Sequence, residues 1–516
     1  MADRIEVVRR TTETKSMSIN NNQASPLYAV IDLGSNSFHM LITRLVADGV
    51  QTVDKVKRKV RLASGLDSNN VLSNDAMSRG YECLHFFAER LQDIAPENIR
   101  IVATATLRIA ENSAEFLTTA ETILGTEVKL LSGVQEAKGI YLGVAHTRDC
   151  SAKRLVLDIG GASTEIVVGE DFTIHHAISL NMGCVTFNEQ FFKGGKLSDN
   201  HFDLAINHAK SNVLPYLANY IDFGWQNVLG GSGTMQALAE ILIHRKRPSI
   251  VTLDFLYEIK TLLIDAGTIE DIAIGGLTSE RKVVLASGLA ILIALFESFE
   301  IDELQLSSGA LREGLLYEML PDMRKVNIRA RTIDSLIERF HIDDAHANRV
   351  TQQALHLFDE LATQWQIDDS QLRSLLFSAC KLHEIGLLLS YKYHQLHGSY
   401  IIEHTDLPGF DQSERQLIML LVRQYRGDIS AESLANLAIT NLATSAKLLS
   451  LLRLAVILCR RRQDEALPEY ELSADNETIR LCLPETWIAK HPLIADELLQ
   501  ENSHLATLGL SLTISC

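Results

Sequence analysis

Two segments of this chain carry the same short sequence motif, and this duplication restricts the possible folds more than any other feature. Residues 30–37 read VIDLGSNS and residues 156–163 read VLDIGGAS. Both have a β-branched start, an Asp, an apolar residue, a Gly, and a Ser three positions after that Gly. Each continues into an apolar stretch, so each predicts a strand, a tight turn and a second strand. Two matching hairpins indicate two similar α/β domains facing each other across a cleft.

Both predicted turns consist of residues that can surround an anion. Glycine lets the backbone approach a ligand closely, and N–H and hydroxyl groups can donate to phosphate oxygens. A third loop of this kind precedes a predicted helix, whose N-terminus favours negative charge. A simple polar turn would explain any one loop, but two matching loops favour a phosphate site. The predicted phosphate-binding residues are Gly34, Ser35, Asn36, Ser37, Gly160, Gly161, Ser163, Gly231, Ser232, Gly233 and Thr234.

Three carboxylates accompany these loops. Asp32 and Asp158 each end an apolar strand, where a carboxylate is costly unless it binds a cation or accepts hydrogen bonds. Glu165 follows the second loop and could reach the same cation. We therefore predict that Asp158, Glu165 and Asp32 hold Mg²⁺. The alternatives are turn-capping aspartates and, for Glu165, an exposed strand carboxylate.

Two further residues are candidates for chemistry. Glu136 opens a predicted helix between the two domains, where a carboxylate could deprotonate a water directed at phosphorus. Acidic residues are also common in the first turn of helices for electrostatic reasons alone. Arg108 follows a predicted strand at the cleft edge and suits bidentate phosphate binding, although an ordinary surface arginine would look the same.

The net charge of −17 argues against binding to nucleic acid or to a membrane surface, because both are polyanionic. A polyanionic substrate must therefore be attracted by local positive charge and metal. The best candidate is the basic strand segment 55–61, in which Lys57, Lys59 and Arg61 share one face. A solvated strand face is the competing interpretation.

Cysteine use and the N-terminus favour a cytoplasmic protein. The seven cysteines form no C-x-x-C motif and their number is odd, which is typical of reduced thiols. Residues 1–26 are polar and lack the apolar core of a signal peptide, so we expect a flexible tail there. The longest apolar stretch, residues 283–296, is too short for a bilayer and predicts a buried helix.

Changes in periodicity divide the rest of the chain into four expected units. Mixed strand and helix signals predict α/β domains over residues 27–140 and 141–322. Helical periodicity then dominates residues 323–465, and a small α+β unit is expected over residues 466–516.

The helical unit contains the pair His383-Glu384, with His394 and His397 downstream. This resembles part of the His-Asp metal phosphohydrolase pattern, but Glu replaces the Asp, and a first His and a last Asp are not evident. We therefore expect an HD-like domain that is structural and metal-free. The run of three arginines at residues 460–462 predicts a solvated helix end, with anion binding as the alternative.

Together, the motifs resemble the exopolyphosphatase/guanosine pentaphosphate phosphatase family, a branch of the actin-like ATPase superfamily. The resemblance extends from about residue 28 to near the C-terminus. The implied fold is two ribonuclease H-like domains facing a cleft, followed by an HD-like all-α domain and a small α+β domain. The motifs are AVIDLGSNSFHML at 29–41, ATATLR at 103–108, SGVQEA at 132–137, LDIGGASTE at 157–165, GGSGT at 230–234, GALREG at 309–314 and LHEIG at 382–386.

The resemblance also implies roles for individual residues. Glu136 matches the family's catalytic base, Asp158 and Glu165 match the metal-holding acids, and the three loops with Arg108 match the phosphate cradle. Family members often carry an acidic pair before the Ala, whereas Gln135 precedes Glu136 here. Because Glu136 occupies the position of the base, we expect activity to be retained. The family contains dimers, so a homodimer is expected.

The implied substrate is guanosine pentaphosphate, which is cleaved to guanosine tetraphosphate in the stringent response, or inorganic polyphosphate. Residues 57–66, 288–296 and 460–468 resemble the guanosine pentaphosphate branch, whereas residues 191–202 resemble the exopolyphosphatase branch. Two other classes stay open: a kinase of the same superfamily and a non-catalytic alarmone sensor. The candidate base argues against the kinase, and the intact carboxylates argue against the sensor.

Overall fold

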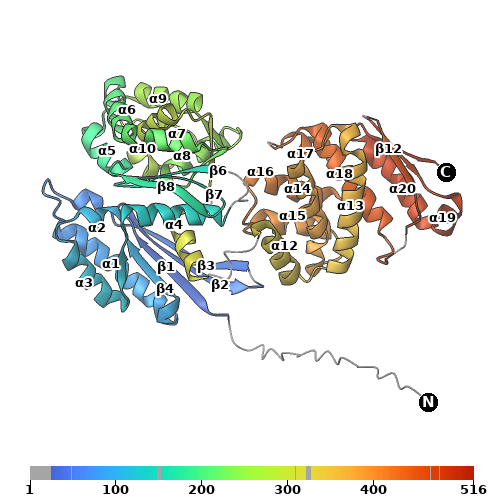
Figure 1. Ribbon diagram of the computed structural model, residues 1–516, viewed down its shortest axis with the longest axis horizontal. Helices are drawn as coiled ribbons and strands as arrows, with labels where there is room; N and C mark the ends of the chain where they lie inside the picture. The colour runs from blue at the N-terminus through green and yellow to red at the C-terminus, as the bar shows by residue number, and fades with distance from the viewer. Residues whose placement is uncertain are drawn as a thin grey trace, which may run out of the picture.

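The computed structural model describes residues 25–47, 49–147, 153–307, 309–320, 327–437, 439–464, 467–475 and 477–515. These residues form two α/β units, one above the other in Figure 1, and a helical half beside them. The tail predicted over residues 1–26 lies outside the described residues, apart from its last two positions.

The first unit is built on a five-stranded sheet. Three antiparallel strands come first, and two parallel strands extend the sheet on the other side of β1. The strand order is β3 (Gly49–Lys59), β2 (Ser37–Val46), β1 (Leu27–Leu33), β4 (Ile99–Ala103) and β5 (Val128–Leu130). Its helices are α1 (Asn74–Leu91), α2 (Ala105–Ile109) and α3 (Ser113–Leu124).

The second unit repeats this topology. Its strands β8, β7, β6, β9 and β11 have the order and directions of β3, β2, β1, β4 and β5, and β10 adds an antiparallel edge. The strands are β6 (Lys153–Ile159), β7 (Thr164–Glu170), β8 (Thr173–Leu180), β9 (Asn227–Gly230), β10 (Ile250–Thr252) and β11 (Glu303–Leu306). The predicted duplication is thus confirmed, because the two sheets share strand order and strand directions.

Helices cover the second sheet on the side away from the first unit (Figure 1). Helix α10 is long and apolar enough to cross a membrane, but 72% of its most apolar window is buried inside the protein. This is the buried helix predicted over residues 283–296. The helices are α5 (Cys184–Phe191), α6 (Asp199–Val213), α7 (Leu217–Phe223), α8 (Gly233–His244), α9 (Leu253–Ala266) and α10 (Ser279–Phe299).

Two helices cross between the sheets: α4 (Gly133–Ala145) and α11 (Leu311–Met319). Glycines let them approach closely, because a Cβ on Gly143 would lie 2.0 Å from the carbonyl oxygen of Ala310, and one on Gly314 would lie 1.8 Å from that of Gly139. Helix α4 lies between the two sheets in Figure 1, and the domain boundary predicted at residue 140 falls within it. The two units are therefore joined by a closely packed helical crossing.

The helical half and the C-terminal strands share one hydrophobic core. Arg453 of α18 and Glu501 of α20 form a buried bidentate ion pair, with distances of 2.6 and 2.8 Å. The elements are α12 (Ile328–Arg339), α13 (Asp344–Trp365), α14 (Ser370–Leu382), α15 (His394–His404), α16 (Gln412–Gln424), α17 (Ala431–Ala435), α18 (Leu442–Leu458), β12 (Glu471–Ala474), β13 (Thr478–Cys482), α19 (Glu485–Lys490), α20 (Pro492–Ala506) and β14 (Ser511–Ser515).

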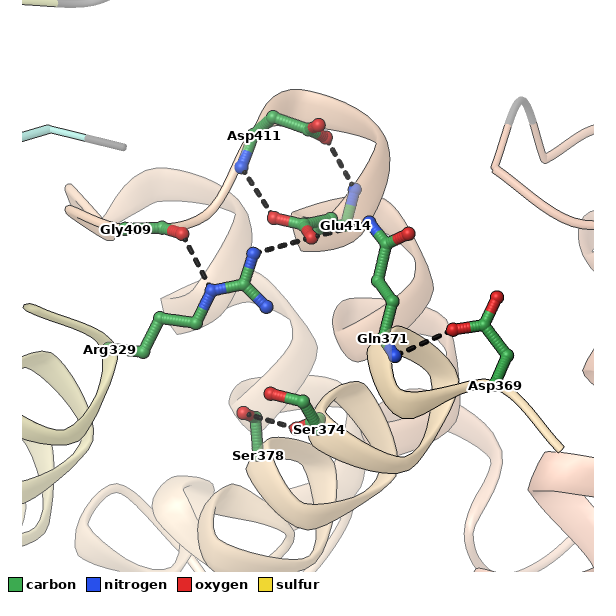
Figure 2. Close-up of polar contacts among 8 residues, drawn as sticks. All are labelled: Arg329, Asp369, Gln371, Ser374, Ser378, Gly409, Asp411 and Glu414. Carbon is green, nitrogen blue, oxygen red and sulfur yellow. Dashed lines mark hydrogen bonds and ion pairs between the residues drawn. The ribbon is translucent and has the colours of Figure 1, made fainter. Parts of the chain in front are cut away.

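A buried polar cluster fixes the loop by which the helical half contacts the α/β units. Figure 2 shows Arg329 donating through Nε to the carbonyl oxygen of Gly409, at 2.9 Å, and through Nη2 to Glu414, at 2.6 Å. The backbone N–H of Gly409 in turn donates to the carbonyl oxygen of Thr147, just after α4, at 2.9 Å. Removing one partner of such a pair leaves the other charge buried and unpaired, at a cost of about 3–5 kcal/mol, so substitution of either Arg329 or Glu414 should weaken this joint.

Candidate active site

The predicted loops leave the two sheets at matching edges. Strands β1 and β4 are parallel neighbours, so loop 34–37 and segment 104–108 emerge side by side. Strands β6 and β9 have the same relation, so loops 160–163 and 231–234 also emerge side by side. Ligand sites in open α/β sheets lie at such carboxyl ends of parallel strands.

The two duplicated turns face each other at short range. A Cβ placed on Gly161 would lie 3.0 Å from the Cβ of Ser35 and 3.4 Å from the backbone nitrogen of Asn36. Within the first turn, a Cβ on Gly34 would lie 2.8 Å from the carbonyl oxygen of Ser37. Glycine is therefore needed both to close the turn and to let the two loops approach.

Four carboxylates lie close to one another near these loops: those of Asp32, Glu136, Asp158 and Glu165. Burial, together with the neighbouring carboxylates, raises the pKa of Asp32 and of Asp158 to about 7. Burial also raises the pKa of Glu165 and of Glu136. One oxygen of Asp32, Oδ1, is buried and has no hydrogen-bond partner in the described structure. A bound cation would offset the repulsion between these carboxylates and would give Oδ1 of Asp32 a partner. The residues therefore fit a divalent metal.

Glu165 is buried in β7 and is held from two sides. Its Oε1 accepts hydrogen bonds from the hydroxyls of Ser163 and Ser179, both at 2.7 Å. The alternative of an exposed strand carboxylate is therefore wrong, since Glu165 is 2% exposed. The Ser163 hydroxyl is occupied by this contact, so phosphate binding at this position would use the backbone N–H.

Glu136 lies in the first turn of α4 and is buried. The helix begins with a capping box in which Ser132 and Gln135 bond each other's backbone N–H, at 3.2 and 2.9 Å. This cap gives Gln135 a structural role. Arg108 donates through Nη1 to Glu136, at 2.6 Å, and to the carbonyl oxygen of Leu131, at 3.0 Å. Arg108 thus orients the candidate base.

Equivalent positions of the two hairpins carry different side chains beside the shared Asp. In the first sheet, Asp32 lies beside His39 of β2, which lies beside Lys57 of β3. In the second sheet, Asp158 lies beside Glu165 of β7, which lies beside Ser179 of β8. We call these the basic row (Asp32, His39, Lys57) and the acidic row (Asp158, Glu165, Ser179). Lys57 of the basic row is suited to a phosphate chain, whereas Asp158 and Glu165 of the acidic row, together with Asp32, are suited to a metal ion.

Arg312 completes the basic row and was missed by the sequence reasoning. Its Nη1 lies 2.6 Å from Nδ1 of His39. Burial and the cations Arg312 and Lys57 lower the pKa of His39 to about 2, so the ring is neutral and accepts this bond. Arg312 also lowers the pKa of Asp32 and of Asp158, which opposes the larger effect of burial. The motif at 309–314 could have indicated Arg312, because it follows strand β11 at the same sheet edge as the phosphate loops of the second unit.

The hydroxyls of the third loop turn into the core. Ser232 contacts the sulfur of Met235 at 2.8 Å, and a Cβ on Gly288 of α10 would lie 2.2 Å from Oγ1 of Thr234. Both side chains are buried. The backbone N–H groups at the start of α8, including that of Gly233, are therefore the donors that this loop can offer to an anion.

The basic strand β3 reaches the second unit at the cleft mouth. Lys59 forms an ion pair with Glu280 at the start of α10, at 2.8 Å. Burial and the neighbouring cations Arg281 and Arg312 lower the pKa of Lys57. Lys57 and Lys59 therefore lie on one face of β3, as their spacing predicts, whereas Arg61 lies beyond the end of the strand, with a φ of 52°.

Comparison with known proteins gives the same picture. The chain matches the Ppx/GppA phosphatase family over residues 41–323, and domain III of Ppx/GppA phosphatases over residues 328–502. It is 48% identical over 489 residues to a guanosine-5'-triphosphate,3'-diphosphate pyrophosphatase of Pseudoalteromonas translucida, covering 95% of this chain and 98% of that one. A protein of the same name from Vibrio cholerae is 46% identical over 493 residues, covering 96% and 99%.

Solved structures show the same fold over the part they cover. An exopolyphosphatase from Cytophaga hutchinsonii has a TM-score of 0.53 at 23% identity, covering 57% of this chain and 98% of its own. A Ppx/GppA family member from Aquifex aeolicus has a TM-score of 0.50 at 24% identity, covering 58% and 99%. The chain therefore belongs to the Ppx/GppA phosphatase family and is a phosphoanhydride hydrolase of that family.

Proposed function

We propose that this enzyme removes the 5′-terminal phosphate of guanosine pentaphosphate, giving guanosine tetraphosphate and phosphate, in the cytoplasm during the stringent response. The observation that carries the proposal is the position of Glu136 in a cleft with two facing phosphate loops and three further carboxylates. The substrate is supported by the names of relatives that are 46–48% identical over nearly the whole chain.

The chain's own residues can direct a water at the terminal phosphorus. The water oxygen forms a bond to phosphorus, the bond to the bridging oxygen breaks, and the proton of the water passes to Glu136. Burial raises the pKa of Glu136, which makes it a better proton acceptor near neutral pH. Arg108 fixes the direction of the carboxylate through the 2.6 Å contact. The backbone of the facing loops and Arg312 bind and position the phosphate oxygens.

Mg²⁺ is the proposed metal because the donors offered by Asp158, Glu165 and Asp32 are all oxygens. When bound, the ion would neutralise charge on the phosphate oxygens. The hydrogen bonds from Ser163 and Ser179 would keep Glu165 in its orientation whether or not the metal is present.

The test is phosphate release by the purified full-length protein with Mg²⁺, comparing guanosine pentaphosphate with long-chain polyphosphate. We expect a higher kcat/KM for the nucleotide. A higher value for polyphosphate would favour the second candidate, an exopolyphosphatase, which the basic face of β3 also suits. Nucleotide binding without phosphate release would make the protein a sensor. Sedimentation of the same sample tests the proposed homodimer.

A further inference from the structure

Three metal-ligating side chains meet in the helical half, far from the phosphate loops. His346, His383 and Glu384 offer ligand atoms that all lie within 4.8 Å of one another, and all three residues are buried. His346 lies in the first turn of α13, and His383 and Glu384 follow the end of α14. The first histidine that the sequence did not reveal is therefore supplied by His346.

The two histidines present unused nitrogens. Nδ1 of His383 lies 2.7 Å from the carbonyl oxygen of Cys380, so it donates there and leaves a lone pair on Nε2. Nε2 of His383 and Nδ1 of His346 are buried and have no hydrogen-bond partner in the described structure. A histidine that ligates a metal characteristically uses its other nitrogen to donate to a backbone carbonyl. His383 already has this arrangement.

We propose that His346, His383 and Glu384 bind one divalent transition-metal ion of the Zn²⁺ or Fe²⁺ class. Two imidazole nitrogens and one carboxylate suit such ions, whereas the all-oxygen cleft suits Mg²⁺. Zinc–ligand bonds are about 2.0–2.2 Å, so small side-chain rotations would bring the three atoms to bonding distance. The ion would tie the start of α13 to the end of α14.

Arg462 supplies the positive charge in the metal-free site. Its Nη2 contacts Oε1 of Glu384, and its Nη1 lies 3.2 Å from Asp343, the N-cap of α13. Its side chain is 43% exposed, so it can swing outward when an ion takes its place. Arg462 is therefore exposed, as expected of a solvated helix end, and it also pairs with two carboxylates. Removing this guanidinium should strengthen metal binding, because it competes for Glu384.

The experiment measures zinc bound by the full-length, chelator-stripped protein after dialysis against Zn²⁺ with excess Mg²⁺, which occupies the cleft. We expect one Zn²⁺ per chain, and X-ray absorption should show imidazole nitrogen and oxygen ligands without sulfur. His383→Gln and Glu384→Gln should each weaken zinc binding by about tenfold or more. Asp158→Asn should keep it, and Arg462→Ala should tighten it several-fold.

Three results would overturn the proposal: no zinc retained by the wild type, equal retention by His383→Gln and Glu384→Gln, or sulfur ligation. Circular dichroism and gel filtration identify a variant that has failed to fold. Because Glu384→Gln preserves shape and hydrogen bonding to Arg462, it tests the ligand with the least structural change. Zinc should also raise the Tm of the wild type but not of this variant, since an ion bound only by the folded state stabilises it.

Discussion

The two halves of the cleft share the same hairpin pattern but differ in the side chain that lies beside the shared Asp of that pattern. Both hairpins place an Asp at the strand end and a glycine turn after it. The residue paired with that Asp is His39 in the first half and Glu165 in the second. At this cross-strand position the first half has a neutral imidazole that contacts Arg312, whereas the second half has a further carboxylate for a metal. A duplicated scaffold can therefore fix the position of a site while single residues decide what each half can bind.

The largest expected effect on activity comes from substitution of Glu136, the proposed base. Glu136→Gln keeps the size of the side chain and its contact with Arg108 but removes the proton acceptor. We expect kcat to fall by about 10²–10⁴-fold with little change in KM. Steady-state phosphate release measures this, with Glu115→Gln, an exposed glutamate of α3, as the matched control. A kcat near that of the wild type would remove Glu136 from the mechanism.

Substitution of His39 and of Glu165, the residues paired with the two aspartates, tests most directly whether the two halves differ in role. Glu165→Gln should raise the Mg²⁺ concentration for half-maximal activity by about 10–100-fold. His39→Gln should change this Mg²⁺ requirement less than Glu165→Gln does and should raise KM, because its direct side-chain contact is with Arg312. Mg²⁺ titrations of both variants provide the measurement. Equal shifts in the two variants would show that the halves do not differ in role.

The carboxylates make the metal-free protein less stable as pH rises. Asp158 has a pKa of about 7 in the fold against 3.8 as its ordinary value, so it must ionise at a cost when pH passes 7. Between pH 6 and pH 8 this costs about 1.4 kcal/mol. We expect the Tm of the metal-free protein to fall over this range, and Mg²⁺ to restore it.

The variant Asp158→Asn isolates this contribution. Its Tm should fall less between pH 6 and pH 8 than that of the wild type, because one titrating group has been removed. Thermal unfolding with and without Mg²⁺ at both pH values measures the difference. Identical pH profiles for the two proteins would contradict a raised pKa at Asp158.

The smallest expected effect concerns attraction of the substrate. Lys57→Ala should raise KM about threefold at low salt, with kcat unchanged, and the difference should shrink as salt screens the charge. Lys129→Ala, on the exposed edge strand β5, is the control with the same loss of charge. If both variants behave alike, net charge rather than the basic row attracts the substrate.

Local features of the site were predictable because they depend on neighbours in sequence. The phosphate turns and the positions of Asp32 and Asp158 follow from glycine geometry and strand alternation within a few residues. The burial of Glu165 was not settled in this way, because it depends on Ser179, a residue of the next strand.

Contacts between distant segments could not be predicted by the same reasoning. Arg108 looked suited to phosphate, but it pairs with Glu136, which lies 28 positions away. Arg312 meets His39 across 273 positions, and His346 meets His383 only when α13 packs on α14. Each of these side chains could have contacted several kinds of partner, and the packing of distant elements determines which partner it contacts.

The sequence by itself determined the duplicated fold, the positions of the phosphate turns and the family, because these are written in short contiguous motifs. Only the tertiary structure decided the partner of Arg108, the contact between Arg312 and His39, and the meeting of His346 with His383 and Glu384. The physical reason is that hydrogen bonds and ion pairs act over a few ångströms. Which groups come within that distance depends on how the elements pack.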